Sequence, residues 1–347
     1  MSVISPIVSV VMPVFNVEPF VAQAIRSVLD QNFTDFELLI VDDGSTDSSL
    51  SIVRSFSDPR IKVIHQTNRG LAGARNTGIR CASGNLIAFI DSDDLWAEDK
   101  LARHVAHLDA NPDVGVSYSQ SAFIDEAGRP IGLVQRPKLA GVEPVDILTR
   151  NPIGNGSAPV IRRAALNEIA FPSPRTGVVE DCFFDESFRQ SEDIECWLRI
   201  ALQTSWRFAG IGRPLTLYRV NAGGLSANLD AQYESWKRAI DKARLYAPDF
   251  VAEFEGLARA YQLRYLARRA VRMRDGEKAL ALVGRALESD ASILWKEPRR
   301  TLVTVAAAIL LAGLPRQTFE RIESRAMRGL RFRPTAVRSS DTRAGAL

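Results

Sequence analysis

The sequence predicts an α/β protein, with a mostly parallel sheet flanked by helices and an all-helical region after it. Residues 7–15 form an almost unbroken apolar run rich in β-branched residues, which is typical of a strand buried on both faces. Strand-like and helix-like patterns then alternate as far as residue 118. After residue 228 only helical patterns recur, which predicts the helical region.

The elements follow in a regular order along the first part of the chain. Apolar runs predict strands at residues 7–15, 36–41, 61–64, 86–90 and 114–118. Apolar residues at helical spacing between these runs predict helices at residues 20–29, 71–82 and 97–109. A further helix is expected after Ser48 and ends at about Phe56. The segment from Asp43 to Ser48 is typical of a turn followed by a helix N-cap. Such alternation forms βαβ units, so the sheet is expected to be mostly parallel.

Composition bounds the class of protein. The 347 residues are 46% hydrophobic and 24% charged, which excludes a disordered chain, a collagen and a disulfide-rich mini-protein. The three cysteines lack metal-ligand spacing and are expected to be buried thiols.

His104 and His107 have no third ligand nearby in sequence, which favours a solvated helix face over a metal site. The longest apolar run, 302–314, is too short to span a membrane, and the N-terminus has no basic signal-peptide region.

The net charge of +3 conceals two regions of opposite sign. Residues 228–347 contain 23 Lys and Arg against 14 Asp and Glu, a net charge of +9, and the preceding residues carry −6. The change of sign falls at the Gly-containing stretch 221–228. We therefore expect an α/β domain over 1–227, a helical domain over 228–338 and a disordered tail over 339–347.

Acidic residues follow three of the expected strands, where ligands bind in parallel sheets. Glu18 comes shortly after the first strand, Asp42 and Asp43 follow the second, and Asp91 and Asp93 follow the fourth. Asp and Asn are common in turns for structural reasons alone. Three acidic turns at one sheet edge nevertheless favour a binding site.

Asp91 and Asp93 suggest a cation site. Side chains alternate along a strand, so those at positions 91 and 93 are expected to point the same way. Two carboxylates suit Mg²⁺ or Mn²⁺, with water and phosphate oxygens completing the octahedron. Two ligands do not form a closed protein cage, which favours a cation shared with a diphosphate ligand.

The glycines argue against two familiar nucleotide sites. The turn after the first strand, residues 13–16, contains no glycine, whereas a dinucleotide site needs G-x-G-x-x-G there. The glycines of NRGLAGARNTG, residues 68–78, have neither that spacing nor a P-loop pattern. They allow a helix to pack closely against the sheet, or form a loop near a nucleotide in which Arg75 contacts phosphate, or both.

Five segments in order resemble glycosyltransferase family 2, which has the GT-A fold. They are VSVVMPVFN, SVLDQNFTDFELLIVDDGSTD, NRGLAGARNTGI, GNLIAFIDSDDLW and FDESFRQSEDIECWLRI. The resemblance covers about residues 6–226. It implies an enzyme that transfers a sugar from a nucleoside diphosphate donor with inversion at the anomeric carbon.

The resemblance also implies roles for single residues. Asp193, the second acid of a Glu-Asp pair, matches the general base, and Asp91 and Asp93 match the D-x-D motif that binds Mn²⁺ or Mg²⁺ with the donor diphosphate. The residues that match the donor nucleotide site are Pro13, Val14, Phe15, Glu18, Asp42, Asp43, Arg75, Asp91 and Ser92. The residues assigned to an acceptor or diphosphate loop are Glu192, Trp197, Arg219 and Ser226.

Other interpretations of these segments stay open at this point. Ser191, Glu192 and Asp193 also suit a helix N-terminus, with Ser191 as the cap and the acids complementing the helix dipole. The stretch 218–226 also suits an interdomain linker. Residues 164–183 are longer than the link expected in the family and are predicted to form a loop on the acceptor side.

The C-terminal region suits an anionic membrane surface. An apolar stretch at residues 302–314 lies beside an Arg-rich segment at 316–333. A buried helix with a basic tail is the alternative. Nucleic acid is not an expected partner, because no reader motif accompanies the charge. Residues 258–286 resemble a tetratricopeptide hairpin, but one or two such units do not make a repeat protein.

The sequence thus predicts an inverting, metal-dependent glycosyltransferase. The expected donor is a UDP-sugar, and the expected acceptor is a hydroxyl of a glycan or lipid-linked saccharide in cell-surface polysaccharide synthesis. The expected location is the cytoplasm, peripheral to the cytoplasmic face of the inner membrane. The alternatives are a nucleotidyltransferase and a catalytically inactive membrane-associated scaffold.

Overall fold

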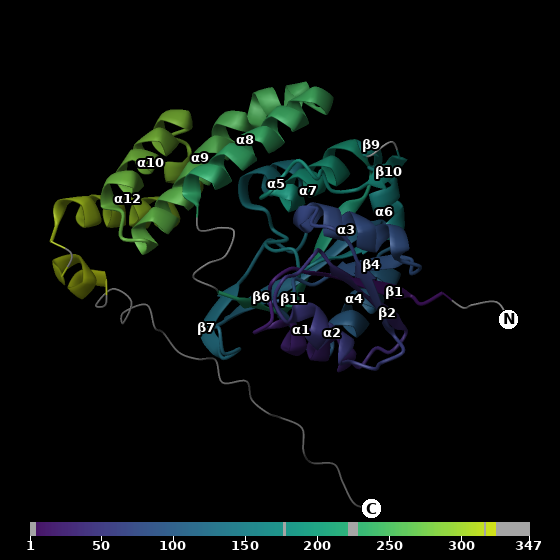
Figure 1. The fold of residues 1–347 in the computed structure, drawn as a ribbon. Helices are drawn as coiled ribbons and strands as arrows, with labels where there is room; N and C mark the ends of the chain where they lie inside the picture. Colours follow the sequence, from purple (N-terminus) through teal and green to yellow (C-terminus); the bar gives the residue numbers. More distant parts are fainter. Residues whose placement is uncertain (1–4, 176–177, 221–227, 316, 324–347) are drawn as a thin grey trace, which may run out of the picture. The chain divides into compact units, whose positions relative to one another are not determined.

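A computed structural model describes residues 5–175, 178–220, 228–315 and 317–323 (Figure 1). The chain divides into two compact units, Met1–Gln262 and Leu263–Leu347. The division lies inside helix α9 (Pro248–Arg272), so helix α8 (Leu229–Tyr246) belongs to the same unit as the sheet. The predicted tail at 339–347 lies outside the described residues.

The first unit is built on a mixed sheet in the order β3-β2-β1-β4-β8-β6-β11-β5, with β7 paired to β6. Its strands are β1 (Val8–Val14), β2 (Phe36–Asp42), β3 (Ile61–His65), β4 (Leu86–Phe89), β5 (Leu95–Trp96), β6 (Val114–Ile124), β7 (Pro130–Gln135), β8 (Val160–Arg162) and β11 (Arg207–Arg219). The pairings give β1, β2, β3, β4, β6 and β11 one direction, and β5, β7 and β8 the opposite one. The prediction of a mostly parallel sheet is therefore confirmed.

Helices cover both faces of this sheet, as Figure 1 shows. They are α1 (Val21–Leu29), α2 (Ser49–Arg54), α3 (Gly70–Cys81), α4 (Lys100–Ala110), α5 (Pro144–Arg150), α6 (Arg163–Glu168) and α7 (Glu192–Gln203). Strand β1 shows why its sequence is apolar throughout: Val11 packs in one hydrophobic core, while Val10 and Met12 pack in the other. On α3, a Cβ at Gly78 would lie 2.3 Å from Val11 Cγ1, so glycine permits the close approach of helix and sheet.

The prediction of a loop at residues 164–183 is wrong. This stretch contains α6 and a two-stranded antiparallel hairpin, β9 (Phe171–Arg175) and β10 (Val178–Cys182). The prolines of FPSPR disfavour a strand in a sequence analysis, but a two-stranded ribbon has only edge strands, where proline is tolerated. Glu180 of β10 forms ion pairs with Arg69 (2.7 Å) and Arg80 (3.3 Å), which tie the hairpin to the α3 region.

Two smaller predictions also need correction. His104 is fully buried and His107 is half-buried, and the Nδ1 atom of each lies 2.8 Å from Ser117 Oγ, so they do not form a solvated face. The sequence does not reveal this contact because Ser117 lies on β6, the next element. Cys182 and Cys196 are buried thiols as expected, but Cys81 is exposed at the end of α3.

The C-terminal region is helical, as predicted. After α8 and α9 come α10 (Gly276–Ser289), α11 (Ile293–Lys296) and α12 (Pro298–Gly313). Asp275 caps α10, because its side chain accepts a hydrogen bond from the backbone N–H of Lys278 (3.0 Å). Among the described residues, no helix has the length and apolar character required to cross a bilayer.

Candidate active site

The site lies where three neighbouring strands end. Strands β2, β1 and β4 are adjacent and parallel, so their carboxyl ends meet at one edge of the sheet. The register places Val14 beside Asp42. The three turns singled out from the sequence are therefore brought together, as ligand binding at this edge requires.

The first turn is tied to the loop after β2. Pro13 and Val14 are buried within β1, whereas Phe15 is exposed. The side-chain oxygen of Asn16 accepts a hydrogen bond from the backbone N–H of Thr46 (2.8 Å), and the Glu18 carboxylate accepts one from the N–H of Ser48 (2.9 Å). Glu18 thus orders the start of α2, and Phe15 is the exposed aromatic ring of this turn.

Asp42 and Asp43 are both buried and bonded to protein groups. Asp42 lies 2.6 Å from His65 Nδ1 and accepts a hydrogen bond from the N–H of Ser45 (3.2 Å). Asp43 accepts hydrogen bonds from the backbone N–H groups of Arg69 and Gly70, both at 2.8 Å. Both carboxylates therefore order the loops around the predicted nucleotide site in this structure.

The acidic segment after β4 is a turn and not an extension of the strand. Strand β4 ends at Phe89, and the N–H of Asp94 donates to the carbonyl of Asp91 (2.9 Å). The prediction that Asp91 and Asp93 follow the alternation of a strand is therefore wrong. Ser92 is buried within this turn, while Asp91 is a quarter exposed.

Two residues that the sequence analysis did not select hold this turn in place. Asp94 is fully buried and accepts hydrogen bonds from Ser157 Oγ (2.6 Å) and the N–H of Arg219 (2.8 Å). Ser157 Oγ also accepts from the N–H of Asp91 (2.9 Å). Burial, and then the neighbouring carboxylates of Asp93 and Asp91, raise the pKa of Asp94 well above its usual value. Because Ser157 lies 63 residues from Asp94 in sequence, no local pattern indicates the pair.

Arg219 lies at the end of β11 and not in a loop. Its side chain is buried, and Nε donates to the carbonyl of Asp93 (2.6 Å). Its guanidinium also donates to the carbonyls of Asp125 and Glu126. In this structure Arg219 therefore fixes the backbone of the acidic turn. Ser226, assigned to the same loop from the sequence, lies outside the described residues.

Arg75 joins the acidic turn to helix α7. It is only 2% exposed, and its two terminal nitrogens donate to Asp91 Oδ1 and Glu192 Oε1, both at 2.8 Å. The rings of Phe89 and Phe184 lie 5.9 and 5.5 Å from the guanidinium carbon. A single cation thus links α3, the turn after β4 and the start of α7.

Glu192 and Asp193 begin α7 at this junction. Ser191 occupies the cap position with a left-handed φ of 61°, and its side chain makes no capping hydrogen bond, so the predicted Ser cap is wrong. Burial raises the pKa of Glu192 to about 7, with Arg75 opposing the shift and Asp193 adding to it. Burial also raises the pKa of Asp193, against Arg75 and with a contribution from Asp91. A carboxylate with a raised pKa is a stronger base than an ordinary one and binds a proton more readily.

Trp197 differs from its predicted role near the acceptor. It is 1% exposed and packs edge-on against Phe184, with ring centroids 6.0 Å apart. Its indole is part of the hydrophobic core that supports α7.

The candidate metal site is open. In the part of the chain that the structure describes, no group of three or more His, Cys, Asp or Glu residues is placed to hold a metal ion. Asp91 and Asp93 can supply two oxygen ligands from one turn, and Asp91 is partly exposed. This donor set fits a hard cation that takes its other ligands from a diphosphate and water.

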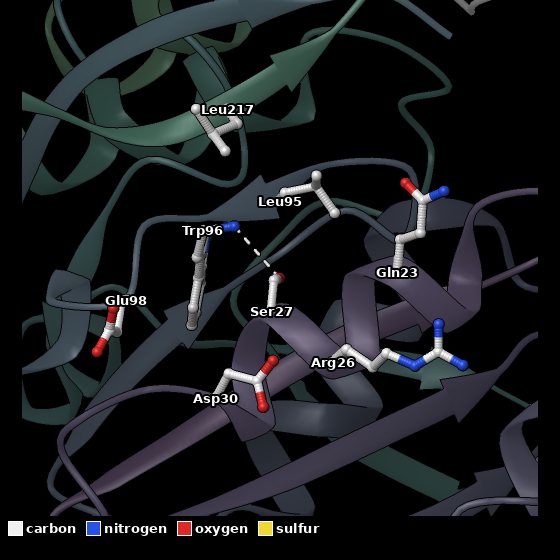
Figure 2. Close-up of a pocket in the computed structure, with 8 residues that line it drawn as sticks. All are labelled: Gln23, Arg26, Ser27, Asp30, Leu95, Trp96, Glu98 and Leu217. Carbon is white, nitrogen blue, oxygen red and sulfur yellow. Dashed lines mark hydrogen bonds between the residues drawn. The ribbon is translucent and has the colours of Figure 1, made fainter. Parts of the chain in front are cut away.

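A groove with a volume of about 600 Å³ lies between α1 and strands β5 and β11 (Figure 2). Its lining residues are Gln23, Arg26, Ser27, Asp30, Leu95, Trp96, Glu98 and Leu217. The N–H of Trp96 donates to Ser27 Oγ (3.2 Å) across it. None of the candidate catalytic or metal-binding residues lines this groove.

Comparison with known proteins gives the family. Residues 9–169 match the family model described as Glycosyl transferase family 2. The Escherichia coli enzyme named UDP-Glc:alpha-D-GlcNAc-diphosphoundecaprenol beta-1,3-glucosyltransferase WfgD is 32% identical over 259 residues, which cover 74% of this chain and 90% of that enzyme. An uncharacterized glycosyltransferase of Rickettsia conorii is 34% identical over 219 residues, which cover 62% of this chain; the chain spans only 33% of its length.

Solved structures share the fold. TarS 1-349 of S. aureus, solved in complex with UDP, matches with a TM-score of 0.56 at 20% identity, over 94% of this chain and 93% of that one. The mannosyltransferase PcManGT of Pyrobaculum calidifontis, solved with GDP-Man and Mn²⁺, matches with a TM-score of 0.57 at 23% identity, over 89% and 87% of the two chains. The GT-A fold expected from the sequence is thereby confirmed. The matched family model and the alignment with WfgD, which covers 90% of that enzyme, place the chain in glycosyltransferase family 2.

Proposed function

We propose that this chain transfers a sugar from a nucleoside diphosphate donor to a hydroxyl group, with inversion at the anomeric carbon. One observation carries the proposal: Arg75 bonds to Asp91 of the acidic turn and to Glu192 beside Asp193. The residues for binding a donor diphosphate and for removing a proton are thus joined at the carboxyl edge of the sheet.

Each residue has a defined part in this reaction. Asp193 accepts the proton of the acceptor hydroxyl as that oxygen forms its bond to the anomeric carbon. The bond from the anomeric carbon to the donor phosphate breaks, and the nucleoside diphosphate leaves with the electron pair. Asp91 and Asp93 would hold Mn²⁺ or Mg²⁺, which when bound neutralises charge on the departing diphosphate. A single displacement inverts the anomeric carbon, and retention in the NMR spectrum of the product would refute this course.

The proposed substrates are a UDP-sugar and a saccharide carried on a lipid diphosphate. The names of WfgD and of the TarS complex support a uridine nucleotide, and the name of WfgD supports a lipid-linked acceptor in polysaccharide synthesis. The GDP-Man complex of PcManGT shows that a protein of this fold can also bind a guanosine diphosphate sugar. A lipid-linked acceptor would require the enzyme to work at a membrane surface.

A thermal-shift experiment tests the donor and the metal together. The full chain is heated with UDP, GDP, CMP or ADP, each with and without Mn²⁺. A nucleotide at 100 times its Kd stabilises the folded chain by about 2.7 kcal/mol, and we expect this with UDP and metal only. Asp93→Ala should abolish the shift, whereas Asp109→Ala, on the exposed end of α4, should retain it.

Product analysis tests the reaction class. A glycosyltransferase releases nucleoside diphosphate from the sugar donor, whereas a nucleotidyltransferase releases pyrophosphate. No shift with any nucleotide, and no release of nucleoside diphosphate, would instead support an inactive scaffold.

A further inference from the structure

Helix α12 of the second unit buries polar side chains and exposes several large aliphatic ones. Its buried residues are Thr301, Thr304 and Ala308. Three of its large aliphatic residues are exposed, Leu302 by 56%, Val303 by 67% and Ile309 by 53%, while Val305, Leu310 and Leu311 are half-buried. A surface helix of a protein in water normally buries the aliphatic residues and exposes the hydroxyls.

The polar interior of this unit holds the reversed orientation in place. Buried Arg264 donates to Thr301 Oγ1 (2.7 Å) and forms an ion pair with Glu297, which is also buried. Thr301 Oγ1 in turn donates to the carbonyl of Ile293 on α11 (2.7 Å). Turning the helix to bury Leu302 would break these bonds, so the aliphatic face belongs on the outside.

Cations accompany the exposed face. Arg299, Leu302, Val303, Ala306 and Ile309 follow one another at helical spacing and are all exposed; we call these five residues the α12 face. Lys296 and Arg300 are exposed beside its N-terminal end, and so is Trp295, by 69%. Aliphatic residues with Lys, Arg and Trp at their margin are typical of helices that lie in the plane of a membrane interface.

We propose that the α12 face binds the surface of an anionic lipid bilayer, lying at the boundary between headgroups and acyl chains. The helix has 16 residues, about 24 Å of length, which suits lying in the interface and not crossing it. Residues 228–347 carry a net charge of +9, which attracts anionic headgroups and repels a second copy of the same region. The inference rests on the proposed function, because it names the surface on which a lipid-linked acceptor would be met.

Vesicle binding by the full chain tests the proposal. Vesicles of phosphatidylcholine with phosphatidylglycerol are compared with phosphatidylcholine alone by co-sedimentation. We expect binding that requires phosphatidylglycerol, and the variant Leu302→Gln with Val303→Gln to bind at least about tenfold more weakly, since two aliphatic side chains no longer enter the interface. Leu245→Gln is the matched control, because Leu245 is 84% exposed on α8 of the first unit.

Charge and fluorescence give independent readouts. Lys296→Gln and Arg299→Gln should each weaken binding to phosphatidylglycerol vesicles about fivefold. Trp295 emission should shift to shorter wavelength on binding, and Trp295→Phe should remove that shift.

Three outcomes would overturn the proposal. The first is unchanged vesicle binding by the Leu302 and Val303 variant, which would place lipid binding elsewhere in the chain. The second is equal binding to both kinds of vesicle. The third is a dimer that the same variant dissociates without changing vesicle binding, which would identify a second copy as the occupant. Stabilisation by nucleotide is measured in the same variants, so a failure of nucleotide binding, on which the proposed function rests, is seen separately from a failure of membrane binding.

Discussion

At the scale of single residues, Arg75 organises the site. Its guanidinium binds two carboxylates from distant segments at once, and the surrounding space is filled: a Cβ at Gly156 would lie 2.1 Å from Arg75 Nη2. Only a planar, permanently charged group with several donors can make both contacts. Arg75 therefore couples the stability of the fold to the geometry of the predicted metal and base residues.

Removal of this cation should be costly. Arg75→Ala leaves buried Glu192 and partly exposed Asp91 without their shared partner, so we expect the free energy of unfolding to fall by about 3–5 kcal/mol. Arg207→Ala, which removes an exposed ion pair with Asp113, should leave the free energy of unfolding unchanged. Denaturant unfolding measures both. A fall no larger in the first variant than in the second would contradict the organising role of Arg75.

Glu192 should make the free energy of unfolding change with pH in the direction opposite to that of an acid whose pKa is lowered in the folded state. Its pKa is raised from 4.5 to about 7, so between these values the folded chain binds more protons than the unfolded chain. The contribution of Glu192 to the free energy of unfolding should therefore fall as the pH rises from 4.5 to 7. Glu192→Gln removes that part, and denaturant unfolding of both proteins across this range measures the difference. An identical pH dependence in the two would contradict the buried position of Glu192.

Asp193 should affect turnover and not donor binding. Asp193→Asn keeps the shape of the side chain but cannot take a proton, so we expect kcat to fall by roughly 10²–10⁴. Stabilisation by nucleotide and metal should stay. Since the pKa of Asp193 is raised, turnover should increase with pH above the usual range for Asp. Steady-state kinetics with the donor identified by thermal shift checks both, and an active Asn variant would reject Asp193 as the base.

At the scale of elements, strands and helices with strong apolar periodicity could be predicted, whereas elements held by distant contacts could not. Strands β1 and β2 are buried on both faces, and their apolar runs predict them to within a few residues. The hairpin β9–β10 was missed because ion pairs to Arg69 and Arg80, about 100 residues away, hold it in place. Strand alternation was wrongly applied to Asp91 and Asp93, which lie in a turn. Ser157 and Arg219 fix this turn, and the local sequence does not indicate either contact.

Helix α3 offers a test of close packing on the sheet. Gly78→Ala would place a Cβ 2.3 Å from Val11 Cγ1, so we expect destabilisation by about 1–3 kcal/mol. Gly284→Ala in α10 meets open space and should stabilise the chain by about 0.5–1 kcal/mol through helix propensity. Thermal unfolding of both variants measures the contrast. Equal effects would mean that α3 lies further from β1 than the structure places it.

At the scale of the whole molecule, the direction of the strands could be predicted, but their order could not. The alternation of strands and helices predicts a parallel arrangement, and six strands share one direction. The insertion of antiparallel β8 between β4 and β6 depends on residues 160–162, whose three-residue strand has no detectable periodicity. Of the site, the acids at strand ends were predicted, whereas Asp94 and Ser157 were not, because their pairing exists only in the folded chain.

The hydrogen bonds within the loops after β1 and β2 also affect ligand binding. Asn16, Glu18 and Asp43 hold these loops by accepting bonds from backbone N–H groups. The loss of conformational entropy that fixes the loops therefore occurs during folding, before any nucleotide arrives. A nucleotide that binds between ordered loops retains more of its contact energy as affinity, and its association rate is not limited by a slow rearrangement of these segments.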